Sequence, residues 1–184
     1  MKIRTRDMIL VSLFTTLTAV GAFINIPIGP VPISLQFLFT ALAAILLGAK
    51  LGALSQIIYV VLGLIGIPIF TGGGGISYIF KPTFGYLIGY IIGCFIIGKL
   101  SEKIGDKTFI KLFSSIIGGV VVVYLIGVPY MYLILKYVMG VNITVSAAIK
   151  TGCIVFIPGD ILKSILCAVL GVKLIPIIRK TYRN

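Results

Sequence analysis

The sequence of 184 residues contains no histidine and no tryptophan, and it has only four acidic residues, Asp7, Glu102, Asp106 and Asp160. Charged residues make up 11% of the chain, against about 25% in soluble domains. A surface with so little polarity would not keep a globular protein in solution. The composition therefore argues against a soluble enzyme, a disordered chain and a DNA-binding domain.

These absences also limit the chemistry that the chain can perform. Asp160 is the single carboxylate within an apolar segment, so no aspartate pair and no triad of the usual type is available for catalysis. The cysteines Cys94, Cys153 and Cys167 lie in apolar runs without metal-ligand spacing. The glycine-lysine dipeptide at 98–99 is not followed by serine or threonine, so the GxxxxGK[ST] nucleotide loop is absent. We therefore expect no catalytic residues, no metal and no resident cofactor.

The chain instead has long apolar segments, because the residues A, V, I, L, M, F, W, Y and C make up 59% of it. A helix needs about 20 mainly apolar residues to cross the hydrocarbon core of a bilayer. The candidate segments are residues 8–26, 35–49, 51–65, 84–100, 110–137 and 147–178. We predict an all-α integral membrane protein in which residues 1–184 form a single domain, a bundle of six transmembrane helices.

Local signals predict how these segments are joined and packed. The second and third are short and are separated only by residues 48–52, so they should form a tight helical hairpin. The fifth and sixth are long and contain Pro129 and Pro158, which predicts a kink or a non-membrane turn at one end. In the fourth segment, glycine recurs at every fourth residue over 85–93, which favours close packing of a neighbouring helix.

The basic residues indicate the orientation of the bundle. Of the 16, the 12 on one side are Lys2, Arg4, Arg6, Lys50, Lys99, Lys103, Lys107, Lys111, Lys173, Arg179, Lys180 and Arg183. The other side has Lys81, Lys136 and Lys150, and Lys163 lies within the last segment. By the positive-inside rule both termini should be cytoplasmic, with loops 27–34, 67–83 and 139–146 outside. The net charge of +12 then reflects membrane topology and not nucleic-acid binding.

An alternative for the N-terminus is a cleaved signal peptide. Lys2, Arg4 and Arg6 precede the apolar residues 8–20, and the small residues at 19–21 resemble a cleavage site. Cleavage would leave five segments and place the new N-terminus outside. The even number of segments satisfies the charge rule, so we favour six.

The last apolar segment contains two ionisable residues, Asp160 and Lys163. A charge within a membrane segment costs at least about 2.5–3.5 kcal/mol, so it indicates a functional site by default. Three residues apart on a helix, the two side chains share a face and neutralise each other. They form either an ion pair that only fixes helix packing or a polar anchor for a ligand. In a ligand site, Asp160 would accept N–H bonds and Lys163 would meet an anion or orient Asp160.

The outer loops contain further candidates. Residues 27–34 include three prolines and should hold an extended shape, and Gln36 follows them as a neutral donor and acceptor at membrane depth. The run of four glycines at 72–75 forms either a flexible connector, or a lid or backbone cradle over a ligand. Tyr86 and Tyr90 belong either to an interfacial aromatic belt or to a pocket wall, and we favour the pocket for Tyr86 because it closely follows the glycine run.

Four motifs occur in one order along the chain: GPVPISLQ at 29–36, FTGGGG at 70–75, PTFGYLIG at 82–89 and GDILK at 159–163. Together they resemble the BioY family, the biotin-binding S components of energy-coupling factor (ECF) transporters. The resemblance extends over residues 11–174. It implies a substrate-capture subunit of the bacterial plasma membrane that works with a transmembrane coupling subunit and two cytoplasmic ATPases in the lipid bilayer.

The resemblance also assigns roles to particular residues. Asp160 and Lys163 correspond to the family's ligand-binding pair, and Gly73 and Gly74 lie in its ligand-covering loop. Gln36 ends the motif near the pocket. The docking surface for the coupling subunit is often an AxxxA motif on the first helix, and the nearest equivalents here are residues 15 with 19 and 18 with 22.

Lys81 and Tyr86 complete the predicted substrate-binding set. Lys81 stands before Pro82-Thr83, where members of the family commonly have glycine or arginine, and Phe84 replaces a frequent glycine. Tyr86 is the tyrosine of the third motif.

Biotin itself suits such a site, because it has an apolar bicyclic body, a ureido group with two N–H donors and one carbonyl, and a carboxylate. We expect Asp160 to accept the ureido N–H groups, with Lys163 and Lys81 at the carbonyl or the carboxylate. The alternatives are an S component for another vitamin, a stand-alone ion-coupled carrier in which Asp160 relays a proton or sodium ion, and, with least support, an intramembrane enzyme.

Overall fold

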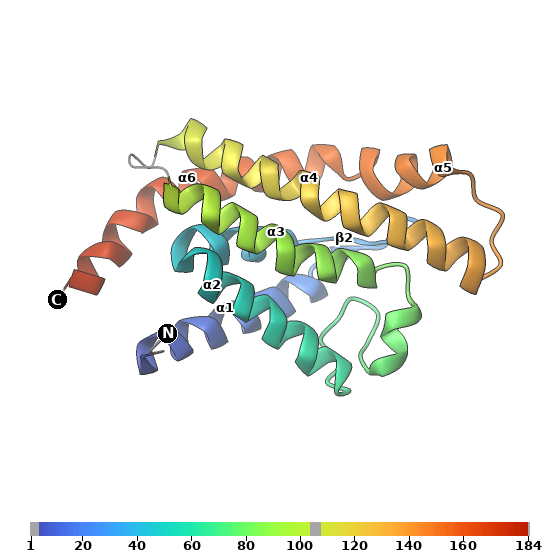
Figure 1. The fold of residues 1–184 in the computed structure, drawn as a ribbon, viewed down its shortest axis with the longest axis horizontal. Coiled ribbons are helices and arrows are strands. Elements are labelled where there is room, and N and C mark those ends of the chain that lie inside the picture. The colour runs from blue at the N-terminus through green and yellow to red at the C-terminus, as the bar shows by residue number, and fades with distance from the viewer. Residues whose placement is uncertain (1–3, 104–107, 184) are drawn as a thin grey trace.

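The computed structural model describes residues 4–103 and 108–183. The long helices are α1 (Thr5–Phe23), α2 (Gln36–Leu64), α3 (Phe84–Lys103), α4 (Phe109–Leu133) and α6 (Ile157–Arg183). The short elements are β1 (Asn25–Ile26), β2 (Ile33–Ser34), the 3-10 helix η1 (Ile76–Phe80), the π-helix η2 (Ile134–Val138), α5 (Val145–Ile149) and the π-helix η3 (Lys150–Ile154). The helices lie side by side in a bundle (Figure 1).

The described part of the chain has five helices that are long and apolar enough to cross a membrane: Thr5–Phe23, Gln36–Leu64, Phe84–Lys103, Phe109–Val138 and Val145–Ile177. The all-α membrane class is therefore confirmed, but the predicted number of six long helices is off by one. The second and third predicted segments are joined in α2. Each of the two segments is shorter than the roughly 20 residues that a full crossing of the membrane requires, so neither is a long transmembrane helix by itself.

Within α2 the chain turns back on itself at Gly48, which has a φ of 82° and a ψ of 178°. Glycine adopts this positive φ at little cost because it has no Cβ. Thr40 Oγ1 donates to Gln56 Oε1 at 3.0 Å, and Gln36 Nε2 donates to Tyr59 OH at 2.7 Å. These paired positions are spaced almost symmetrically about Gly48, so the two arms run antiparallel. The predicted helical hairpin is confirmed.

The last predicted segment is interrupted before Pro158, as the sequence indicates. The π-helix η3 ends at Ile154, and α6 begins at Ile157. Pro158 is thus in the first turn of α6, where no backbone N–H is required. The helix continues through Pro129, and the irregularity at that end of the fifth segment is the π-helix η2.

Helices α3 and α4 approach closely along the glycines of α3. A Cβ on Gly89 would lie 3.0 Å from Val123 Cα, and one on Gly93 would lie 3.1 Å from the carbonyl oxygen of Gly119. Larger residues would force the helices apart, so the predicted packing role of these glycines is confirmed.

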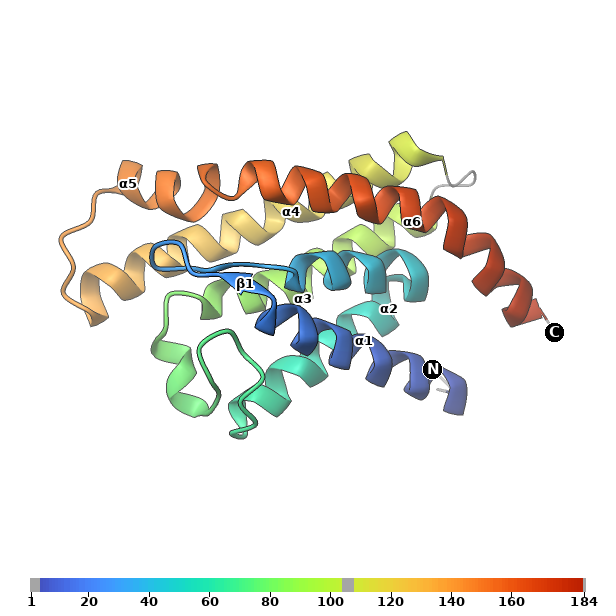
Figure 2. The ribbon, with the colours of Figure 1, turned by 180° about the vertical axis from the view of Figure 1, so that it is seen from behind.

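The first turn of α1 and the last turns of α6 lie at the same end of the bundle, together with the bend in α2 (Figures 1 and 2). The β1–β2 hairpin, the segment containing η1 and the loop before α5 lie at the other end. This arrangement is the one that the charge distribution requires for two cytoplasmic termini, although the orientation itself stays a prediction. Lys2 and Lys107, which were counted among the twelve cations, lie outside the described residues.

Some of the small residues on α1 that were suggested as a docking surface for the coupling subunit already form contacts within the chain. Thr15 is 5% exposed and donates to the carbonyl of Ser55 at 3.0 Å. Thr18 is 0% exposed and accepts from Gln56 Nε2 at 3.2 Å, and Ala22 is also buried. Both suggested pairs therefore use residues that face α2, because hydroxyl groups at membrane depth form hydrogen bonds inside the bundle.

Candidate ligand-binding site

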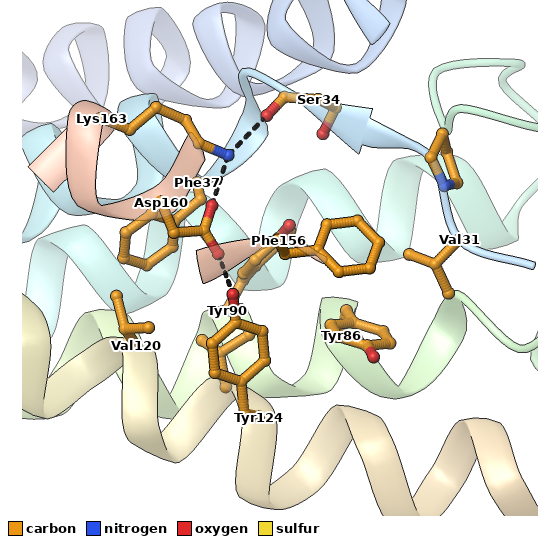
Figure 3. Close-up of a pocket in the computed structure, with 12 residues that line it drawn as sticks. Val31, Ser34, Phe37, Tyr86, Tyr90, Val120, Tyr124, Phe156, Asp160 and Lys163 are labelled. Carbon is orange, nitrogen blue, oxygen red and sulfur yellow. Dashed lines mark hydrogen bonds and ion pairs between the residues drawn. The ribbon is translucent and has the colours of Figure 1, made fainter. Parts of the chain in front are cut away.

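The predicted ion pair is formed, and it joins two parts of the fold. Asp160 lies in the first turn of α6, and Lys163 Nζ is 2.5 Å from its Oδ1. The side chains of Lys163 and Asp160 are 9% and 14% exposed. Lys163 also donates to the backbone carbonyl of Ser34 at 3.0 Å, which ties α6 to β2 (Figure 3).

Tyr124 of α4 completes the polar centre by donating its hydroxyl to Asp160 Oδ2. The sequence did not indicate this residue, because Tyr124 lies in an unbroken apolar run 36 positions from Asp160. A carboxylate has about four lone-pair positions, and Lys163 and Tyr124 occupy two of them. Asp160 therefore keeps acceptor capacity for a ligand.

The ion pair lies in a cavity that is lined by both apolar and polar side chains. Its aromatic side chains are Phe37, Tyr86, Tyr90, Tyr124 and Phe156, which come from α2, α3, α4 and the turn before α6. Figure 3 shows these rings around the carboxylate of Asp160. A cavity that combines apolar walls with a few placed polar groups is typical of a small-molecule site.

Two further cavities continue from the first toward the loops. The second shares Tyr86 and Tyr90 with the first, and the third shares Thr71 and Tyr78 with the second. Pro32 lines all three. The cavities therefore follow one another from the ion pair to the end of the bundle that holds the β1–β2 hairpin.

Gln36 lines the second cavity and not the first. Its Oε1 accepts from Ser34 Oγ at 3.0 Å, and its Nε2 donates to Tyr59 OH, which in turn donates to the carbonyl of Ile69 at 2.9 Å. The side chain is 4% exposed. These bonds link Ser34, whose backbone carbonyl accepts from Lys163, to Ile69 in the segment after α2. Gln36 therefore supports the site and does not contact the ion pair.

The glycine run is a folded loop. Gly73 has a φ of 108° and exchanges two backbone hydrogen bonds with Phe70, of 2.9 and 3.2 Å. A Cβ on Gly74 would collide with the carbonyl of Ile67. Neither Gly73 nor Gly74 lines the three cavities, whereas Gly72 lines the outermost. The predicted glycines thus shape the loop, which itself borders the outer cavity.

Lys81 and Tyr86, the other predicted residues, lie at different depths. Lys81 is exposed, lines the outermost cavity and donates to the carbonyl of Gly72 at 2.7 Å. Tyr86 is 6% exposed, lines the two inner cavities and donates to the carbonyl of Gly152 at 2.6 Å. The structure thus brings Tyr86 to the ion-pair cavity and leaves Lys81 at the mouth. Tyr90 lines the same inner cavities as Tyr86.

The fold and the site define a multi-pass membrane protein with a cavity for a small molecule. The model of the BioY family matches residues 1–180. The chain belongs to the BioY family.

Curated relatives match over most of the chain. The chain is 37% identical over 175 residues to the probable biotin transporter BioY of Lysinibacillus sphaericus, covering 95% of this chain and 89% of the relative. It is 38% identical over 170 residues to the biotin transporter BioY of Thermotoga maritima, covering 92% and 95%. The crystal structure of the S-component for biotin from an ECF-type ABC transporter is similar, with a TM-score of 0.70, 32% identity and coverage of 92% of this chain and 90% of the other.

Proposed function

We propose that this chain is the biotin-binding subunit of an ECF-type vitamin uptake transporter and that it captures biotin on the outer side of the membrane. The observation that carries this proposal is the Asp160–Lys163 pair, which lies in the innermost of the three cavities in series. The names of the relatives and of the similar solved structure support biotin as the ligand.

The donors and acceptors of the site match the ureido group. The remaining lone pairs of Asp160 accept the ureido N–H groups. Lys163 has three donor protons, of which Asp160 and Ser34 take two, so one remains for the ureido carbonyl. The aromatic wall packs against the bicyclic body, whose burial adds the apolar part of the affinity.

The valerate chain follows the second cavity, which leads away from the ion pair toward the loops. Its carboxylate then reaches the outermost cavity, where Lys81 provides a cation beside the backbone of Gly72. A pairing at this exposed position contributes modestly to affinity because water screens the charges.

Energy for uptake comes from other subunits in this proposal. No segment of the printed sequence has the GxxxxGK[ST] pattern of a nucleotide loop. A transmembrane coupling subunit and two cytoplasmic ATPases would deliver the bound biotin, and residues 1–184 would act as one membrane domain with both termini in the cytoplasm.

Titration of the purified chain with biotin, thiamine and riboflavin tests this function. We expect biotin to bind at one molecule per chain and the other two vitamins to give no saturable signal in calorimetry. Saturable binding of thiamine or riboflavin without biotin binding would overturn the ligand assignment. Uptake by proteoliposomes that contain this chain alone, driven by a proton gradient, would instead support an ion-coupled carrier.

Tyr124→Phe is expected to weaken biotin binding by about 10-fold, or about 1.4 kcal/mol, because the Asp160 carboxylate loses the hydroxyl that orients it toward the ligand. The ring keeps its packing, but the lost hydrogen bond to a charged group also lowers the stability of the free protein by about 1.5–3 kcal/mol, so the thermal midpoint should fall. The dissociation constants of the two proteins in the same detergent check this. Unchanged affinity would mean that Tyr124 does not orient Asp160 for the ligand.

Lys81→Gln is expected to weaken biotin binding by about threefold, which is the size of an exposed ion pair of about 0.7 kcal/mol. Biotin methyl ester lacks the carboxylate, so its affinity should be the same for wild type and variant. Competition binding with the two ligands checks this difference. An equal loss for both ligands would place the carboxylate away from Lys81.

A further inference from the structure

A crevice separate from the three cavities opens on the side of the bundle between α4 and the α5–η3 segment. It is lined by Val121, Tyr124, Leu125, Val128, Ile149 and Cys153, with Pro129 at its edge. Its single hydroxyl group, that of Tyr124, is engaged with Asp160. The crevice therefore offers only apolar surface.

The surroundings of this crevice identify its occupant. Leu125, Val121 and Ile149 are 69%, 50% and 45% exposed, and they lie on helices long and apolar enough to cross the membrane. At that depth the medium is the hydrocarbon of the bilayer. An acyl chain of a lipid is the component of this medium that fits an apolar crevice.

Charges at the adjoining helix ends complement a lipid phosphate. Lys150 directly follows Ile149 of the crevice, and Lys136 lies in η2 beyond the end of α4; both are exposed. Among the described acids, Asp160 is paired with Lys163, and Asp7 and Glu102 lie on α1 and α3. Neither lysine therefore has a carboxylate partner among the described residues.

We propose that one acyl chain of a phospholipid occupies this crevice, with its phosphate at Lys150. The chain packs against the ring of Tyr124, which forms part of both the crevice and the ion-pair cavity. The bound lipid then holds Tyr124 in the position from which its hydroxyl reaches Asp160 (Figure 3).

Photo-crosslinking tests the occupant directly. The wild-type chain is placed in nanodiscs with phosphatidylglycerol that carries a diazirine in the middle of one acyl chain, and adducts are mapped by peptide mass spectrometry. We expect the adducts to concentrate on residues 121–129 and 149–153. Adducts spread evenly over the lipid-facing residues of α6 would overturn the proposal.

Filling the crevice provides the matched comparison. Val128→Phe and Val121→Phe should each reduce adducts on residues 149–153 at least fivefold. Val169→Phe adds the same bulk to α6 at a residue that is 39% exposed and outside the crevice, so its adducts should match wild type. Two filling variants are used so that one that does not fold leaves the test intact. Undiminished adducts in a folded filling variant would contradict the proposal.

The headgroup is tested separately with Lys150→Gln. In equal mixtures of the diazirine-labelled forms of phosphatidylglycerol and neutral diacylglycerol, wild type should favour the phospholipid at least threefold in crevice adducts. The variant should lose this preference. A preference that persists in the variant would overturn the assignment of the phosphate to Lys150.

The effect on the ligand rests on the proposed function. Biotin should bind wild type at least threefold more weakly in lipid-free detergent than in phosphatidylglycerol nanodiscs, whereas Val128→Phe, in which the new ring replaces the acyl chain, should show no such difference. Equal wild-type affinities in both media would overturn the link to Tyr124. If biotin binds in neither medium, the proposed function fails, and the crosslinking map still decides whether the crevice holds a lipid.

Discussion

Asp160→Asn is expected to weaken biotin binding by at least about 100-fold, or about 2.7 kcal/mol. The carboxylate accepts two ureido N–H groups in the proposed complex, and each hydrogen bond to a charged group contributes about 1.5–3 kcal/mol. Asparagine has nearly the same shape but carries no charge and presents an N–H₂ group toward one donor. Titration of the purified variant with biotin measures the loss.

A second variant separates this loss of affinity from a loss of folding. Removing one partner of a buried ion pair costs about 3–5 kcal/mol, because Lys163 remains buried without its carboxylate. The double variant Asp160→Asn with Lys163→Met removes both charges and should recover most of the thermal stability without recovering binding. Biotin affinity within threefold of wild type in either variant would refute the role of Asp160.

Gly98→Ala is expected to destabilise the bundle by about 1–3 kcal/mol, the usual cost of overpacking a tightly packed site. An added Cβ would collide with the backbone of Ala49, directly after the bend in α2. That backbone has little freedom to move, because the N–H of Ala49 donates to Glu102 Oε1 at 2.8 Å. A lower thermal midpoint in detergent measures the effect.

Gly118→Ala is the matched control on α4. A Cβ there would meet only the end of the Leu100 side chain, at 3.2 Å, and Leu100 is 40% exposed and free to shift. Alanine also favours the helix over glycine by up to about 1 kcal/mol. We therefore expect a midpoint equal to or above wild type. Equal losses in both glycine variants would contradict the packing of α3 on the α2 bend.

The parts of the fold and site that follow local rules were predictable from the sequence. The spacing of Asp160 and Lys163 places them one helical turn apart, and the cost of charge in a membrane makes their pairing nearly obligatory. The glycine at position 48, between two short apolar segments, predicts the hairpin. In both cases the signal and the structure lie within a few residues of each other.

Contacts between distant segments were not predictable in the same way. Tyr124 is one of nine tyrosines, and nothing in its apolar neighbourhood distinguishes it from a lipid-facing ring. Gln36 was expected near the ligand, and it lines the second cavity, where its amide is held by Ser34, two residues away, and by Tyr59, which only the folded hairpin brings to it. The count of long helices also differed, because the arms of α2 are individually too short to cross a membrane.

A structure of the chain with bound biotin tests the central claim most directly. The account predicts the ureido group within hydrogen-bond distance of Asp160 and Lys163, with the valerate directed toward Lys81. Biotin bound elsewhere, with the Asp160–Lys163 pair sealed from it by protein, would contradict the account.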